Sequence, residues 1–200
     1  MGAGLCIFSS HALLGLSLAL RVRLGSLLLL AERPVEAEAA YRRALELDPD
    51  YPTALAFISL TCAARREFPQ AIAAAERAAA VHGHPLWLAM TGQAYGWAGR
   101  RDDARRVLDQ LAHLAERQYV SPMAFGIIHQ ALGNLDEWYA HMRECVEERS
   151  GLLTILGSPQ FDNARADPRF DAFLDRIGAS RIPAIGSRTT GSGRQQRQRD

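Results

Sequence analysis

His82 and His84 are the closest pair of potential metal ligands in the sequence, separated only by Gly83. A protein zinc site needs three or four ligands, and no third histidine or cysteine lies close to this pair along the chain. The glycine between the histidines and the proline after them are typical of a turn. We therefore interpret both histidines as loop residues and predict no metal site.

Two pairs of neighbouring carboxylates, Asp102–Asp103 and Glu147–Glu148, are the best candidates for acid–base chemistry. General acid–base catalysis needs a second group positioned to donate or accept a proton, and neither pair has such a group at a suitable spacing. The chain also contains no lysine, which excludes a phosphate-loop lysine and a Schiff base. Because no other catalytic motif occurs, the sequence predicts no catalytic residue, no cofactor and no enzyme activity.

The three cysteines, Cys6, Cys62 and Cys145, are far apart and odd in number, and none forms a CxxC pair. They are typical of small buried residues or free thiols in a reducing compartment. With 48% hydrophobic and 22% charged residues, the composition is that of an ordinary soluble protein. The sequence therefore predicts a cytoplasmic protein.

Residues 1–17 are apolar, and residues 12–20 resemble the hydrophobic part of a secretory signal. No positive charge precedes them, however, and Arg21 and Arg23 follow directly. A membrane span reaching Leu30 would bury both arginines, at about 2.5–3.5 kcal/mol each. We therefore interpret residues 1–17 as an apolar helix or a leader, and we do not expect a membrane anchor.

A recurring helical pattern organises the remainder of the chain. In residues 37–49, small and large apolar residues recur at steps of three and four, which places them on one face of a helix that ends at Pro49. Ala37, Ala71, Ala104 and Trp138 then follow at intervals of 34, 33 and 34 residues. A fixed period of this length indicates a repeat protein. We predict four helical hairpins over residues 18–150, with units at 18–51, 52–84, 85–118 and 119–150.

These residues resemble the tetratricopeptide repeat family. Its signature appears in the first unit as Leu24-Gly25, Ala37, Tyr41, Ala44 and Pro49, and in the third unit as Leu88, Gly92, Tyr95 and Ala104. The resemblance implies an all-α fold, a right-handed α-solenoid of about four hairpins, and a role in protein–protein interaction. Small residues allow close contact between the helices of a hairpin. Trp138 replaces such a small residue in the fourth unit, so we expect that hairpin to be splayed or shifted by one residue.

The chain changes character after the repeats. In residues 151–178, Pro159-Gln-Phe161-Asp162 is echoed by Pro168-Arg-Phe170-Asp171, and we predict a C-terminal capping segment with one helix. This end resembles the repeat regions attached to bacterial winged-helix regulators, nucleotide cyclases and serine/threonine kinases. Residues 179–200 are rich in glycine, serine, glutamine and arginine, which predicts a disordered basic tail.

The resemblance implies a binding surface on the concave face, formed by the first helix of each hairpin. The predicted contact residues carry no charge, so we expect a hydrophobic peptide or a partner helix as ligand. They are Val22, Ser26, Leu29 and Leu30; Ala56, Leu60, Ala63 and Ala64; Leu86, Ala89, Gln93 and Trp97; and Met123, Ile127 and Gln130.

Four alternatives remain open from the sequence. The contact residues could instead pack on the C-terminal helix or on residues 1–17. The chain could be a regulatory module of a transcription factor, cyclase or kinase system. Its basic tail could bind nucleic acid, although the body is mildly acidic and therefore a poor nucleic-acid surface. It could also be exported or tethered to a membrane. The sequence identifies neither the partner nor the oligomeric state.

Overall fold

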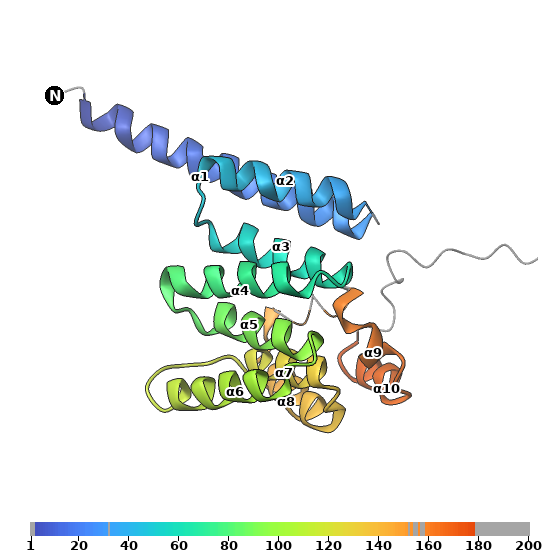
Figure 1. Cartoon of the computed structure of the whole chain (residues 1–200). Coiled ribbons are helices and arrows are strands. Elements are labelled where there is room, and N and C mark those ends of the chain that lie inside the picture. Colours follow the sequence, from blue (N-terminus) through green and yellow to red (C-terminus); the bar gives the residue numbers. More distant parts are fainter. Residues whose placement is uncertain (1–2, 32, 152, 154–155, 157–158, 179–200) are drawn as a thin grey trace, which may run out of the picture.

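The structure, a computed structural model, describes residues 3–31, 33–151, 153, 156 and 159–178. Every regular element in these residues is helical (Figure 1). Four consecutive helix pairs are followed by three short elements. The pairs are α1 (Ala3–Leu30) with α2 (Pro34–Leu47), α3 (Pro52–Ala64) with α4 (Phe68–His82), α5 (Pro85–Trp97) with α6 (Arg101–Ala115), and α7 (Pro122–Leu132) with α8 (Leu135–Glu147). The short elements are η2 (Pro159–Phe161), α9 (Asp162–Arg165) and α10 (Arg169–Arg176).

Local sequence explains where these helices begin and turn. Proline occupies the first position of α2, α3, α5 and α7, where its missing N–H costs nothing and its fixed φ suits a helix. The turn inside each of three hairpins contains one residue in the left-handed conformation. These residues are Arg66, Gly99 and Gly133, with φ of 62°, 75° and 77°. Glycine adopts this conformation without strain, so two of the three hairpins use it.

The hairpins stack in a row from α1–α2 to α7–α8, and α9 and α10 lie at the side of the stack (Figure 1). The all-α solenoid predicted from the repeat period is therefore confirmed. α1 is a continuous helix of 28 residues, twice the length of α2. It thus runs without a break past residue 18, where the first unit was predicted to begin. The predicted basic tail lies outside the described residues.

The apolar core has two large parts joined by a small seam. One part lies among α1, α2 and α3 with Ala71 of α4, and the other joins α5 to α8 and the C-terminal segment. Between them, Ile72, Ala75 and Ala94 form a separate small cluster on α4 and α5. Because alanine buries little apolar area, this seam contributes less packing energy than either large part.

Close contact within the hairpins depends on glycine in the first helix. A Cβ added at Gly25 would lie 2.7 Å from Cζ and 2.8 Å from Cδ1 of Tyr41. The Tyr41 ring is fully buried and stacks on Phe57, with ring centroids 5.1 Å apart. In the fourth hairpin, a Cβ added at Gly126 would lie 2.5 Å from the terminal methyl of Met142. The small residues of the repeat therefore mark real helix contacts.

Trp138 is accommodated in a way that the repeat pattern does not predict. Its indole is fully buried and lies against three aromatic rings of the C-terminal segment, with centroids 6.3 Å from Phe161, 6.1 Å from Phe170 and 6.2 Å from Phe173. Gly126 contacts Met142 of α8, which lies sixteen residues further along the chain. The same spacing separates Gly25 from Tyr41. The expected register shift is therefore wrong, and α7 and α8 remain in close contact at Gly126. The two sequence echoes place Phe161 and Phe170 over the same indole.

Candidate functional site

The predicted contact residues all lie on the first helices of the hairpins, α1, α3, α5 and α7. α5 contacts both α3 and α7 directly, so α3, α5 and α7 form one continuous surface. Part of the predicted set remains accessible to solvent, and we call this part the inner face. It consists of Ser26 and Leu29 on α1, Leu60, Ala63 and Ala64 on α3, and Leu86 and Trp97 on α5. The side chain of Leu30 lies outside the description.

Four other predicted contact residues are buried between helices. Val22, Ala56, Ala89 and Gln93 are 6%, 2%, 0% and 1% exposed. Val22 belongs to the core of the first two hairpins, and Ala89 to the core of the last two. These residues stabilise the stack, so a partner cannot reach them in this conformation.

The fourth hairpin is covered by the C-terminal segment. Met123, Ile127 and Gln130 on α7 are at most 3% exposed. Gln130 donates from Nε2 to the carbonyl oxygen of Gln160 at 2.6 Å, and Asn163 donates from Nδ2 to the carbonyl oxygen of Gln130 at 3.0 Å. The structure therefore removes these three residues of α7 from the accessible contact surface. Gln130 thus contacts the C-terminal segment, which is one of the alternatives that the sequence leaves open.

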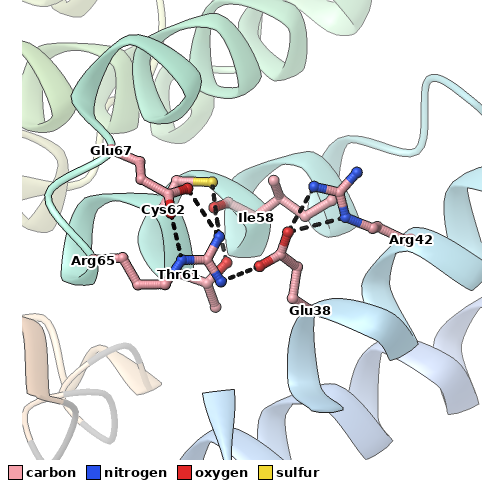
Figure 2. Close-up of polar contacts among 7 residues, drawn as sticks. All are labelled: Glu38, Arg42, Ile58, Thr61, Cys62, Arg65 and Glu67. Carbon is pink, nitrogen blue, oxygen red and sulfur yellow. Dashed lines mark hydrogen bonds and ion pairs between the residues drawn. The ribbon is translucent and has the colours of Figure 1, made fainter. Parts of the chain in front are cut away.

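A buried carboxylate connects the first hairpin to the second (Figure 2). Glu38 on α2 is 7% exposed and accepts hydrogen bonds from two arginines. Arg42, one turn further along α2, donates to Oε1 from Nε at 2.9 Å and from Nη2 at 2.6 Å, and Arg65 donates to Oε2. Arg65 also donates to Glu67 at 3.0 Å and lies 3.9 Å from Sγ of Cys62. This network fixes the end of α3 against α2.

The electrostatics of Glu38 follow from these partners. Hydrogen bonds from Arg65, more than those from Arg42, hold the pKa of Glu38 below its ordinary value, although burial acts in the opposite direction. Sequence reasoning missed this site. The i, i+4 spacing of Glu38 and Arg42 does indicate the ion pair between these two residues. Nothing in the local sequence indicates Arg65, which lies 27 residues away.

We expect the Glu38→Gln variant to lose about 1–3 kcal/mol of unfolding free energy at neutral pH, because the arginines lose a charged acceptor. The lowered pKa means that this stabilisation is present above the unfolded-state pKa of about 4.3 and is lost as pH falls through the folded value. The stability difference between wild type and variant should therefore be constant near neutral pH and shrink below about pH 4. Urea unfolding followed by circular dichroism at several pH values measures this difference.

The matched control for that experiment is Glu36→Gln. Glu36 is 53% exposed and pairs with Arg33 on the surface, so its loss should cost less than about 0.5 kcal/mol at any pH. Other groups that titrate in acid are common to the wild type and both variants and cancel in the differences. Equal losses from the two substitutions would contradict a stabilising role for the buried network.

The Asp102–Asp103 pair singled out from the sequence forms ion pairs on the surface of α6. Asp103 accepts hydrogen bonds from Arg100, at 2.5 Å, and from Arg106. Asp102 accepts one from Arg105 at 3.0 Å. These pairs follow the helix surface at a spacing of three residues and stabilise the first turn of α6. The arrangement resembles a solvated, charge-paired helix end more than an acid–base pair.

His84, His129 and Cys145 also have packing or capping roles. His84 accepts a hydrogen bond at Nδ1 from the backbone N–H of Leu86, at 3.1 Å, and so caps α5. Burial, with the neighbouring His141, lowers the pKa of His129. Burial raises the pKa of the Cys145 thiol to about 11, which keeps it protonated and unreactive near neutral pH. No group of three or more potential metal ligands occurs in the described part of the chain.

Comparison with known proteins supports the repeat architecture. Residues 18–51, which include the second half of α1 and all of α2, match the family model described as Tetratricopeptide repeat. Comparisons with curated proteins and with solved structures gave no match. Among the described residues, no helix has both the length and the apolar character that crossing a membrane requires.

Proposed function

We propose that this tetratricopeptide repeat protein is a non-catalytic binding module that holds a hydrophobic peptide or a partner helix on its inner face. Repeats of this family generally mediate protein–protein interaction. The main support for this proposal is that accessible, uncharged residues lie on the first helix of each of the first three hairpins. They include Leu29 of α1, Leu60 of α3 and Trp97 of α5.

The chemistry of the inner face indicates the class of ligand. None of its residues is charged, so it offers no counter-ion for a terminal carboxylate or a phosphate group. Large apolar side chains favour the apolar face of an amphipathic helix or an extended hydrophobic segment. A half-buried tryptophan such as Trp97 is the residue type that most often dominates binding energy. Leu60 and Trp97 are therefore the central contacts in the proposal.

The C-terminal segment limits the length of the ligand. It covers α7 through Gln130, Gln160 and Asn163, so the accessible surface spans only the first three hairpins. A bound segment that continued over the fourth hairpin would have to displace the hydrogen bonds of Gln130. The proposed ligand is accordingly one that contacts α1, α3 and α5.

Selection from a displayed random-peptide library on the immobilised protein tests this proposal. We expect the selected peptides to be apolar and to lose about tenfold or more in affinity with Trp97→Ala, as for a binding hot spot. Fluorescence anisotropy of labelled peptides gives the affinities, and circular dichroism checks that helicity is unchanged. Leu47→Ala is the control, because Leu47 is exposed on α2 and outside the inner face. Undiminished binding by both Trp97→Ala and Leu60→Glu would exclude the inner face as the binding surface.

A further inference from the structure

The outer face of α1 carries four exposed leucines. Leu16, Leu20, Leu24 and Leu27 are 57%, 60%, 52% and 64% exposed. Their spacing of four, four and three residues places them along one side of the helix, opposite the buried side that holds Leu18 and Val22. We call these four residues the leucine stripe. Monomeric proteins seldom leave a contiguous apolar patch of this kind uncovered.

The other hairpins show what normally covers this face. Leu27 corresponds by the repeat period to Thr61, Ala94 and Ile128, which are 1%, 1% and 0% exposed. Each of these is buried in a first helix that packs on the second helix of the preceding hairpin, as α3 does on α2, α5 on α4 and α7 on α6. Among the described residues, no helix lies in that place against α1. The stripe is therefore a packing face of the solenoid that the described residues leave uncovered.

We propose that the leucine stripe is the interface of a homodimer, in which α1 packs antiparallel on α1 of a second copy. The stripe is self-complementary under a twofold axis near residue 22. That axis places Leu20 opposite the partner's Leu24, and Leu16 opposite the partner's Leu27. Burying both stripes at once would give each copy the kind of cover that α3 and α5 already have.

The opposite end of the stack favours this closed arrangement over a chain of copies. The side of α8 that holds Trp138 is covered by Phe161 and Phe170 of the same chain. The α1 helix of a second copy therefore has no equivalent uncovered face on α8 to pack against. Pairing like faces around a twofold axis uses both stripes and stops at two copies.

Area and charge predict a reversible dimer. Each leucine buries on the order of 100 Å², so the stripe supplies about half of the roughly 800 Å² per partner found in standard interfaces. The rest must come from flanking residues of α1, which contains no acidic residue. Arg23 is exposed at the edge of the stripe and would lie near the partner's Arg23. Association should therefore be in the micromolar range and should strengthen with salt, which screens this repulsion.

Sedimentation velocity of the full chain over a concentration series tests the proposal. We expect a monomer–dimer equilibrium in the wild type and a monomer for Leu20→Glu combined with Leu24→Glu. Both leucines are exposed, so circular dichroism should show unchanged helicity. Leu47→Glu, on an exposed leucine of α2, should still dimerise. The proposal would be overturned if the wild type stayed monomeric at high micromolar concentration, whether or not it bound anionic vesicles. It would also be overturned if the double variant still dimerised.

Crosslinking tests the antiparallel orientation. In a Cys6→Ser background, Leu16→Cys and Leu27→Cys variants are mixed and treated with a short bismaleimide. Cys62 and Cys145 are buried and should not compete. We expect crosslinked dimers mainly in the mixture, because each new cysteine then faces the other variant's cysteine. Efficient crosslinking of either variant alone would contradict the antiparallel arrangement.

Discussion

Trp138→Ala should lower the free energy of unfolding by about 3–5 kcal/mol, the typical cost of truncating a large aromatic residue in a core. The indole is fully buried and contacts Tyr139 as well as the three phenylalanines of the C-terminal segment. Its loss leaves a cavity between α8 and α10 that small rearrangements cannot fill. Chemical denaturation followed by circular dichroism measures the change.

Trp138→Ala should also loosen the C-terminal segment selectively. Limited proteolysis should cut residues 159–178 sooner than in the wild type, while α1 to α4 stay protected, because stability in a repeat stack depends mainly on adjacent units. Trp97→Ala is the control, since its indole is only half-buried and it should cost less than about 2 kcal/mol. A loss for Trp138→Ala no larger than that of the control would show that the aromatic cluster does not hold the C-terminal segment.

Gly25→Ala should cost about 1–3 kcal/mol, as expected for overpacking a core contact. Alanine favours a helix by up to about 1 kcal/mol over glycine, but here its methyl group would meet the ring of Tyr41. That ring is stacked on Phe57 and fully buried, so it cannot move aside without disturbing α3. Thermal and urea unfolding give the change in stability.

Gly126→Ala is the matched comparison for this prediction. The added methyl would be crowded by the terminal methyl of Met142 and would make ordinary contacts with His141 and Trp138. The Met142 methyl is the end of a flexible side chain that can adopt another rotamer. We therefore expect a change within about 1 kcal/mol, since the gain in helix propensity offsets part of the crowding. Equal destabilisation by the two substitutions would show that the rigidity of Tyr41 does not decide the outcome.

The sequence was sufficient to predict the helical hairpins and their order. Small residues return at a fixed period because each hairpin repeats the same close contact, as Gly25 and Gly126 show. Proline and glycine then mark the starts and turns of the helices. These signals are local, so one chain read alone contains them.

The parts of the site that sequence reasoning missed depend on residues far apart in the chain. The period places Gln130 on a first helix but cannot show that Gln160 and Asn163 cover it. The predicted contact residues of the fourth hairpin are therefore buried in the structure. The Glu38–Arg65 contact was missed for the same reason. Charged residues on two helix surfaces give no sign of which pair will meet.

The alanine-rich seam between α4 and α5 has a mechanical consequence. Ile72, Ala75 and Ala94 form a smaller apolar cluster than the aromatic and aliphatic layers on either side, so we expect the stack to bend at this joint. Leu60 lies on one side of the joint and Trp97 on the other. Such bending would change the separation of these two side chains. We therefore expect the span between them to adjust to proposed ligands of different thickness.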